Sequence, residues 1–385
     1  MEIYGTIGPA CEQVRQLEEM FRLGMTGIRL NASHSSLESA DAWIKNIRQA
    51  AEAAGVKPQL LIDLQGPELR IRLAGEMHLT EGEKVLLRSA AQEKEVYSDH
   101  ADKNAVYEKE IGIPDELAAV LTEQMELLLN DGKILLQTDQ KVTDGYLCKV
   151  LRGGILSSGK SIVIKDQRIA LPTLTAADIQ NIKAAKAYGV TGVMLPFVRG
   201  KKDLDALKQA LKESESESLK IYAKIENREG IQALDEIIEG CDMVVIARGD
   251  LGNAVPLWEL PVVQHQIEER CKKKNRKFMV VTQMLASMEY EKVPTRAEVS
   301  DVFRAVSEGA DAIMLTGETA AGNYPVAAME YFVKTADCAL KYFTQFNSKR
   351  PEAPHGRTRP FEETGRPISS AVIFPWNFFN SVPNI

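Results

Sequence analysis

Cysteines are few and scattered in this chain of 385 residues, and their spacing excludes two common kinds of site. An odd number of isolated thiols, with no CxxC pair, supports neither a disulfide framework nor a zinc site. We therefore expect reduced thiols, most of them buried. The five are Cys11, Cys148, Cys241, Cys271 and Cys338.

The chain also lacks long apolar runs and blocks of like charge. No stretch reaches the roughly 18 uninterrupted apolar residues of a membrane span, and MEIYGTIGPA opens with a strand-like pattern rather than a signal segment. The net charge is -7, with both signs mixed along the chain, which argues against nucleic acid as a partner. We expect a soluble, cytoplasmic protein with no membrane or nucleic-acid partner.

What the chain does contain is a regular alternation of short, β-branched runs and amphipathic stretches of helical length. This alternation is typical of α/β proteins with a parallel sheet and crossover helices, and eight runs fit a closed (β/α)8 TIM barrel. The runs cover residues 3–8, 27–33, 60–64, 192–197, 220–225, 243–248, 278–283 and 312–317. Helical patterns follow at 11–24, 36–55, 175–189, 204–214 and 295–309.

Residues 71–170 interrupt this alternation. Short alternating segments such as MHLTEGEKVLLRS and KILLQTDQKV, separated by Gly and Asp turns, predict an all-β domain inserted into a loop of the barrel. We assign residues 1–70 and 171–342 to the catalytic barrel. In residues 343–385, the Pro-rich stretch FNSKRPEAPHGRTRPFEETGRP predicts a flexible connector.

Polar side chains collect at the ends of the predicted barrel strands. In a barrel of this kind, the C-terminal strand ends and the loops after them form the active face. Any single residue there could merely cap a helix, but the whole set predicts an active site. The set is Thr6, Arg29, Asn31, Ser33, Asp63, Lys224, Glu226, Asp250, Thr282 and Thr316.

Lys224, Glu226 and Asp250 carry the sharpest chemical signal. They end the apolar runs in IYAKIEN and VVIARGDLG. The two carboxylates offer hard oxygen ligands to Mg²⁺ or Mn²⁺, and the ammonium suits a substrate with phosphate or enolate charge. Two structural alternatives stay open: a Lys224–Glu226 ion pair, and Asp250 as a helix N-cap after Gly249.

Nine strings resemble the signature blocks of the pyruvate kinase family, in that family's order, from residue 3 to about residue 342. KIEN, ARGDLG and GETAAGNYP are highly specific together. The resemblance implies a barrel, an inserted β-barrel lid and a C-terminal α/β domain, of which residues 343–385 would be a linker and a remnant. The strings are TIGPA, IRLNASH, IDLQGPELR, LPTLTAADI, AKIENREG, IARGDLG, VTQMLASM, PTRAEVSDV and MLTGETAAGNYP.

The resemblance also implies the reaction, which is phosphoryl transfer from phosphoenolpyruvate to ADP in the last step of glycolysis, giving pyruvate and ATP. It gives Lys224 and Arg29 the role of cations at the phosphoryl group, and Glu226 and Asp250 the role of Mg²⁺ ligands. Thr282 would lie near the path of enolate protonation.

Further roles come from the same resemblance. The backbone amides of Gly249 and Asp250 would hold the substrate carboxylate. A K⁺ site would use Asn31, Ser33, Asp63 and the backbone carbonyl of Leu64.

The nucleotide side is implied to involve Asn31, His34, Arg70 and Lys160, the last from the inserted lid. Glu68 matches the form associated with K⁺ dependence, because relatives with Lys there carry their own cation. Gln65 departs from the Lys usual in the family, which would weaken ADP binding.

Two other functions stay open. Gln65 and the altered lid fit a sensor that binds phosphoenolpyruvate and metal without turnover. The Glu226–Asp250 pair would also suit a Mg²⁺-dependent 2-oxo acid lyase or decarboxylase. A homo-oligomer is compatible with the resemblance, but a dimer or a monomer is favoured over a tetramer, because family tetramers also use the C-terminal domain.

Overall fold

The computed structural model describes residues 1–33, 35–89, 107, 109–130, 132–165 and 171–347. His34 and nearly all of the predicted connector lie outside these residues. Contacts group Met1–Phe343 into one unit and Thr344–Ile385 into another. The boundaries predicted for the inserted lid therefore remain predictions.

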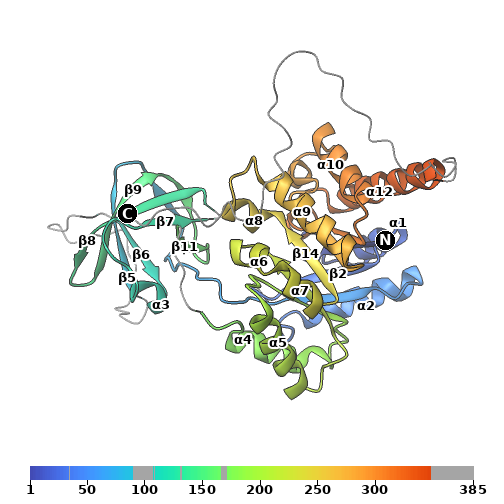
Figure 1. Cartoon of the computed structure of the whole chain (residues 1–385), viewed down its shortest axis with the longest axis horizontal. Coiled ribbons are helices and arrows are strands. Elements are labelled where there is room, and N and C mark those ends of the chain that lie inside the picture. The colour runs from blue at the N-terminus through green and yellow to red at the C-terminus, as the bar shows by residue number, and fades with distance from the viewer. Residues whose placement is uncertain (34, 90–106, 108, 131, 166–170, 348–385) are drawn as a thin grey trace, which may run out of the picture. The chain divides into compact units, whose positions relative to one another are not determined.

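The predicted eight-stranded barrel is confirmed, because eight parallel strands close on themselves in the order β1-β16-β15-β14-β13-β12-β3-β2 (Figure 1). Each strand begins within one residue of the start of a predicted run. The last residues of several runs lie beyond the strand, in the segment that follows it. The strands are β1 (Glu2–Thr6), β2 (Gly27–Asn31), β3 (Gln59–Asp63), β12 (Gly192–Leu195), β13 (Lys220–Ile225), β14 (Met243–Ala247), β15 (Lys277–Val281) and β16 (Ala312–Met314).

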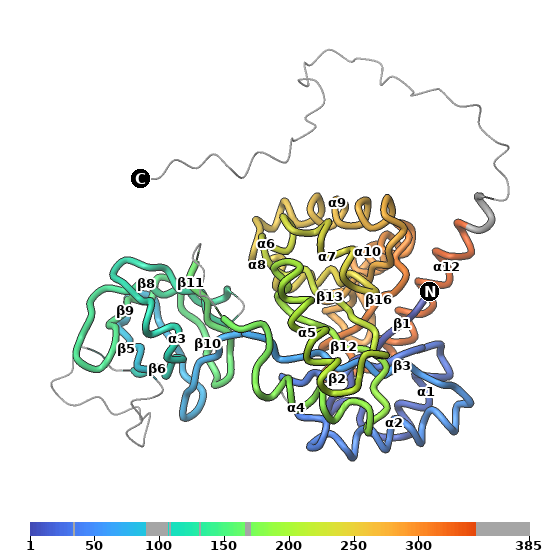
Figure 2. Tube along the Cα trace, turned by 60° about the horizontal axis from the view of Figure 1, so that its bottom comes forward, coloured from blue at the N-terminus to red at the C-terminus, as the bar shows by residue number. Residues whose placement is uncertain are grey.

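Helices surround the barrel strands, as the trace in Figure 2 shows. Thr175 and Thr295 begin α4 and α10 with capping boxes, which fix these starts from the sequence. The helices are α1 (Val14–Leu23), α2 (Asp41–Ala54), α4 (Ala176–Ala185), α5 (Lys201–Glu213), α6 (Arg228–Gln232), α7 (Leu234–Gly240), α8 (Arg248–Ala254), α9 (Leu260–Lys273), α10 (Arg296–Ser307), α11 (Gly317–Ala320) and α12 (Pro325–Asn347), with a 3₁₀ turn, η2, at Ala286–Glu289.

The barrel strands are buried on both faces, which explains why their sequences are continuous apolar runs instead of alternating ones. Large side chains such as Tyr4, Met194, Tyr222 and Met279 fill the interior. A second apolar layer lies between the strands and the surrounding helices. The interior is therefore a packed core, and chemistry is confined to the strand ends.

The segment between β3 and β12 forms a separate apolar core. Its described strands build a six-stranded sheet, β11-β7-β8-β9-β5-β6, and a two-stranded ribbon, β10-β4. The all-β prediction is thus confirmed, and the described strands form a mostly antiparallel sheet with a short antiparallel ribbon. The elements are β4 (Met77–Leu79), β5 (Lys84–Ser89), β6 (Lys109–Ile113), α3 (Asp115–Ala118), β7 (Glu126–Leu129), β8 (Ile134–Val142), β9 (Gly145–Arg152), β10 (Gly154–Leu156) and β11 (Ile162–Ile164).

All five cysteines are free thiols, and four of them are buried, with Cys338 exposed. Burial raises the pKa of Cys148 to about 12, so this thiol stays protonated. Among the described residues, none of the helices combines the length and the apolarity needed to cross a lipid bilayer.

Glu268 on α9 is an unusual feature of the fold, because its carboxylate is fully buried. Gln264 Nε2 donates to its Oε1 at 2.8 Å. Its Oε2 accepts no hydrogen bond from the described residues and lies 3.8 Å from His265 Nδ1. Burial raises the pKa of Glu268, and the bond from Gln264 only partly opposes this shift.

The substitution Glu268→Gln is expected to stabilise the protein increasingly as the pH rises. A carboxyl whose folded pKa is raised favours folding at low pH and loses that contribution between its unfolded pKa, about 4.3, and its higher folded pKa. The amide does not titrate, so the stability difference should grow across that window and then level off. Urea unfolding of both proteins at several pH values measures it.

Glu239→Gln provides the control of opposite sign. Glu239 is exposed and accepts a hydrogen bond from Lys274 at 2.7 Å, which lowers its pKa. Its substitution should therefore cost stability as the pH rises. If the free energy of unfolding of Glu268→Gln changed with pH in parallel with that of the unsubstituted protein, the pKa of Glu268 would not be raised by folding.

Candidate active site

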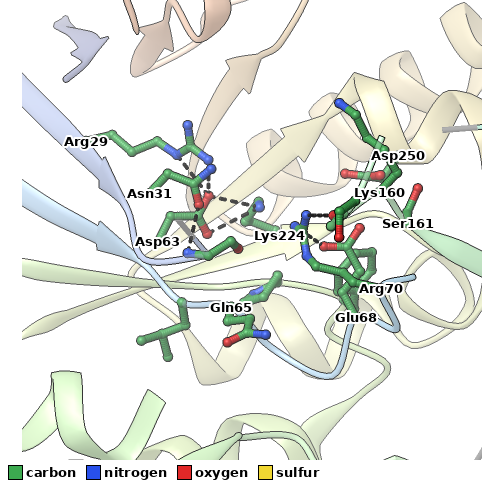
Figure 3. Close-up of a pocket in the computed structure, with 16 residues that line it drawn as sticks. Arg29, Asn31, Asp63, Gln65, Glu68, Arg70, Lys160, Ser161, Lys224 and Asp250 are labelled. Atoms are coloured by element: carbon green, nitrogen blue, oxygen red, sulfur yellow. Dashed lines mark hydrogen bonds and ion pairs between the residues drawn. The ribbon is translucent and has the colours of Figure 1, made fainter. Parts of the chain in front are cut away.

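A pocket of about 370 Å³ opens at the C-terminal ends of the barrel strands (Figure 3). It brings together nine of the residues predicted for the site, from strands β2, β3 and β13, the loops after β2 and β3, the first turn of α8 and the segment between β10 and β11. They are Arg29, Asn31, Ser33, Asp63, Leu64, Arg70, Lys160, Lys224 and Asp250.

Asp63 lies at the centre of a buried ionic network at this pocket. Arg29 donates to Asp63 Oδ2 from Nε at 2.8 Å and from Nη2 at 2.6 Å. Lys224 Nζ lies 3.2 Å from Oδ1 and 3.1 Å from Oδ2 of Asp63, and 3.0 Å from Oε1 of Glu226. The side chains of Arg29 and Lys224 are each 13% exposed, and those of the carboxylates at most 2%. Charge therefore links β13 to β3 across the intervening strand β12, and it adds to the backbone pairing of β2 with β3.

The network changes the acidity of its members in different directions. Burial opposes ionisation of Asp63, but Lys224 and Arg29 outweigh it and lower its pKa. Burial likewise disfavours the ammonium of Lys224, and the Asp63 and Glu226 carboxylates more than compensate, so its pKa is raised. Burial raises the pKa of Glu226, with Lys224 opposing. Both Lys224 and Asp63 are thus held in their charged forms.

Glu226 retains an oxygen without a hydrogen bond. Its Oε2 accepts from the backbone N–H of Phe197 at 2.8 Å. Its Oε1 is buried and accepts no hydrogen bond from the described residues, although it pairs with the charge of Lys224. Glu226 itself is not among the residues that line the pocket, whereas Asp250 lines it. The charge of Asp250 raises the pKa of both Glu226 and Lys224. Two such carboxylates fit the hard oxygen ligands that a divalent cation prefers.

Two structural alternatives were open for these residues, namely a Lys224–Glu226 ion pair and Asp250 as a helix N-cap. The Lys224–Glu226 ion pair exists, but Lys224 also pairs with Asp63, so it is part of a network. Asp250 is not the N-cap of its helix, because Ala247 holds that position and Asp250 lies in the first turn of α8.

The residues predicted for K⁺ line one pocket and all supply oxygen donors. Asn31 Oδ1 accepts from the N–H of Ser33 at 3.2 Å. Leu64, the fourth member, lies in the loop after β3, and its backbone carbonyl is the predicted ligand. The donor chemistry fits a monovalent cation next to the Asp63 carboxylate.

The loop after β3 is shaped by Gly66 and Asp178. Asp178 accepts from the N–H of Gln65 at 2.7 Å and of Gly66 at 3.1 Å. Gly66 has φ +62°, and a Cβ there would lie 2.4 Å from Pro196 Cγ, so only glycine fits. Gln65 and Glu68 consequently face the pocket.

Arg70 connects this loop to the segment before β11. It pairs with Glu68 and donates to the carbonyl of Gly159 at 2.7 Å. The N–H of Ile71 donates to the carbonyl of Lys160 at 2.9 Å. Lys160 is exposed and lines the pocket, as predicted from the resemblance.

Thr282 and Gly249 are not among the residues that line the pocket, although Gly249 directly precedes the lining residue Asp250. The N–H of Gly249 donates to Thr282 Oγ1 at 2.8 Å, and this hydroxyl donates to the carbonyl of Val281 at 2.6 Å. The Gly249 amide predicted to hold a substrate carboxylate is therefore engaged with Thr282 in this structure.

Some residues at the site were not predicted from the sequence. Ser158, Gly159, Ser161 and Phe197 line the pocket, and no motif marks them. Arg248 stands inside ARGDLG, yet it contacts the Thr282 loop and Asp301 instead of the pocket. The sequence signal available for Arg248 was its position at the end of the apolar run MVVIAR.

A second group of metal-ligand side chains lies elsewhere among the described residues, formed by His265, Glu269 and Glu308. Lys272 Nζ lies 3.1 Å from a carboxylate oxygen of each glutamate. The lysine thus already neutralises this group, and the strand-end pocket remains the candidate metal centre.

The closed barrel and its charged strand-end pocket define a (β/α)8-barrel protein with a site built for anions and cations together. Residues 1–329 match the family model described as pyruvate kinase, barrel domain. The chain belongs to the pyruvate kinase family.

Individual relatives agree with this assignment. The chain is 35% identical over 364 residues to the pyruvate kinase of Sporosarcina psychrophila, covering 92% of this chain and 60% of the relative. It is 32% identical to that of Aeropyrum pernix (94% and 75%), and 34% identical to pyruvate kinase PKLR of Homo sapiens (92% and 63%). The chain thus spans about three fifths of the length of the first of these relatives.

Removing the charge at the centre of the network is expected to destabilise the barrel strongly. Asp63→Asn keeps the side-chain shape but leaves Arg29 and Lys224 without a shared counter-charge. Breaking a buried pair in this way costs about 3–5 kcal/mol. Urea unfolding of the variant measures the loss.

Asp139→Asn is the matched control, since Asp139 and Lys84 pair at 3.3 Å with both side chains more than 40% exposed. Exposed pairs contribute at most about 1 kcal/mol. Equal losses in the two variants would contradict a structural role for the Asp63 network.

Proposed function

We propose that this protein is a phosphotransferase that converts phosphoenolpyruvate and ADP to pyruvate and ATP. The observation that carries the proposal is the buried network of Arg29, Asp63, Lys224 and Glu226, the first three of which line one pocket together with Asp250. Membership of the pyruvate kinase family supports the same reaction.

The chemistry asks little covalent help from the protein. Phosphoryl transfer depends on holding the reacting oxygens in line and on neutralising charge on the transferred group. Lys224, whose pKa is raised by its carboxylate neighbours despite burial, supplies a permanent point charge. Arg29 supplies a planar fork for the phosphoryl oxygens, with Asp63 holding both cations in place.

Glu226 and Asp250 would hold Mg²⁺ or Mn²⁺, and Asn31, Ser33, Asp63 and Leu64 would hold K⁺. When bound, these ions neutralise charge on the phosphoryl group and the enolate. Asn31, Arg70 and Lys160 would contact the nucleotide. His34, predicted for the same role, lies outside the described residues.

Protonation of the enolate carbon completes the reaction. Thr282 would pass a proton toward that carbon, through water, because an aligned hydroxyl relays protons well. The amides of Gly249 and Asp250 at the start of α8 would orient the substrate carboxylate, once the Gly249 amide exchanges its Thr282 partner.

The same proposal includes the organisation of the chain. Residues 1–70 and 171–342 would form the catalytic barrel, 71–170 a lid, and 343–385 a linker and a remnant of the family's C-terminal domain. The protein would act in the cytoplasm, as a monomer or a homo-oligomer.

The deciding experiment combines a coupled assay with calorimetry. Pyruvate formation that needs phosphoenolpyruvate, ADP, Mg²⁺ and K⁺ supports the proposal. Binding of phosphoenolpyruvate and Mg²⁺ without turnover would favour the sensor. Pyruvate formed from oxaloacetate without nucleotide would favour the 2-oxo acid lyase or decarboxylase.

Lys224→Met is expected to lower kcat at least about 100-fold, since it removes a preorganised charge from the transferred group. The coupled assay measures the loss, and circular dichroism checks the fold. Lys224→Arg keeps the charge beside Asp63 and Glu226, and so separates loss of charge from loss of folding. Turnover of the Met variant within about tenfold of the parent protein would refute this role.

Glu68→Lys is expected to relieve the requirement for K⁺. The side chain lines the pocket, and an ammonium there would replace the charge of the monovalent ion. Activity is measured in K⁺ and in a tetramethylammonium salt. Glu81→Lys is the control, because Glu81 is exposed in the loop between β4 and β5, and this variant should still require K⁺. If Glu68→Lys also still required K⁺, the predicted position of the K⁺ site would be wrong.

A further inference from the structure

Arg248 is a buried cation that the proposed reaction does not use. It is the first residue of α8, directly after β14, and it is 8% exposed. Its guanidinium does not line the pocket, and it points into the loop after β15 instead. A charge held out of water needs specific partners, and those partners reveal what it does.

The guanidinium binds the backbone of two consecutive residues. Its Nε and Nη2 donate to the carbonyl of Thr282 at 3.2 and 2.8 Å. Its Nη2 also lies 3.2 Å from the carbonyl of Gln283. The planar fork of arginine suits this double contact, which a lysine would not reproduce.

The backbone that Arg248 binds is in an unusual conformation. Thr282 has φ +67° and Gln283 has φ +53°. A β-branched residue rarely adopts this left-handed region, and such geometry persists only when surrounding contacts enforce it. The bonds from Arg248 are contacts of that kind.

The side chain of Thr282 is held from the same helix. Gly249, the next residue after Arg248, donates its N–H to Thr282 Oγ1 at 2.8 Å. Residues 248 and 249 therefore fix the carbonyl and the hydroxyl of one threonine. Once the Gly249 amide turns to the substrate carboxylate, as the proposed function requires, the bonds from Arg248 to the carbonyl of Thr282 still hold this residue.

The charge of Arg248 is balanced from a third element. Its Nη1 pairs with Asp301 on α10. The arrangement connects α10, the start of α8 and the end of β15 through one side chain.

We propose that Arg248 is a positioning residue for Thr282, holding its hydroxyl where the enolate carbon is protonated. This inference rests on the proposed function of the pocket. The competing interpretation is that Arg248 only fastens α8 to α10, in which case its loss would affect stability without a specific link to Thr282.

The test compares Arg248→Met, Thr282→Val and the double variant. Each is assayed for turnover and for exchange of the methyl hydrogens of pyruvate with solvent deuterium. Arg248→Met is expected to lower the exchange rate about 100-fold, within the range of a positioned proton-transfer group, with KM for phosphoenolpyruvate nearly unchanged. Because both substitutions disable one group, the double variant should be no slower than Thr282→Val.

Arg248→Lys keeps the charge and replaces the Met variant in the test if that variant folds poorly. It should lose part of the exchange of the methyl hydrogens of pyruvate with solvent deuterium. Arg199→Met is the matched control, because Arg199 also pairs with an aspartate, Asp203, and donates to a backbone carbonyl, that of Leu171. It should leave exchange unchanged. Multiplicative losses in the double variant, or unchanged exchange in both Arg248 variants, would overturn the inference.

A crystal structure of Arg248→Met separates this inference from the proposed function. If the parent protein has no turnover, the proposed function fails, and the position of Thr282 still decides the role of Arg248. We expect Thr282 to leave the positive-φ region in the variant. An unmoved Thr282 would overturn the positioning role whatever the parent's activity.

Discussion

The carboxylate of Asp63 between Arg29 and Lys224 is the interaction on which the site depends. Burying a charge is tolerated only when partners replace its water, and here one aspartate on β3 serves a cation from β2 and another from β13. The closed barrel makes this possible, because parallel strands bring all their C-terminal ends to one rim. Each cation is therefore held in place before any substrate arrives, which reduces the reorganisation that catalysis would require.

The network is left incomplete on the side of Glu226. One of its oxygens is bonded to the Phe197 amide, and the other is buried with only the charge of Lys224 beside it. A buried acceptor without a hydrogen bond costs free energy, so an added cation would be favoured there. The nearby charge of Asp250 would strengthen that preference.

The sequence predicted most of the barrel because strands buried on both faces require continuous apolar runs, and these are visible without a structure. Polar residues at strand ends converge, so the sequence also indicated much of the pocket lining, although Thr6, Glu226, Thr282 and Thr316 of that set do not line the pocket. It could not predict how they pair: the bonds from Arg29 and Lys224 to Asp63 depend on register and side-chain rotamers. Helix α9 was missed although Pro261 marks its start. Arg248 was overlooked because a charged residue inside a motif does not reveal which way it points.

Backbone strain shows where stability and site geometry are in conflict. Phe197 and Thr282 both have positive φ, and each follows a barrel strand and contacts a site residue, Glu226 in one case and Gly249 in the other. Strained residues of this kind persist when the surroundings hold them. Glu226 holds Phe197, which itself lines the pocket, whereas Arg248 and Gly249 hold Thr282 from outside the pocket lining. Because a charged side chain fixes each of these loops, a substitution of Glu226 or Arg248 is expected to alter loop geometry as well as charge.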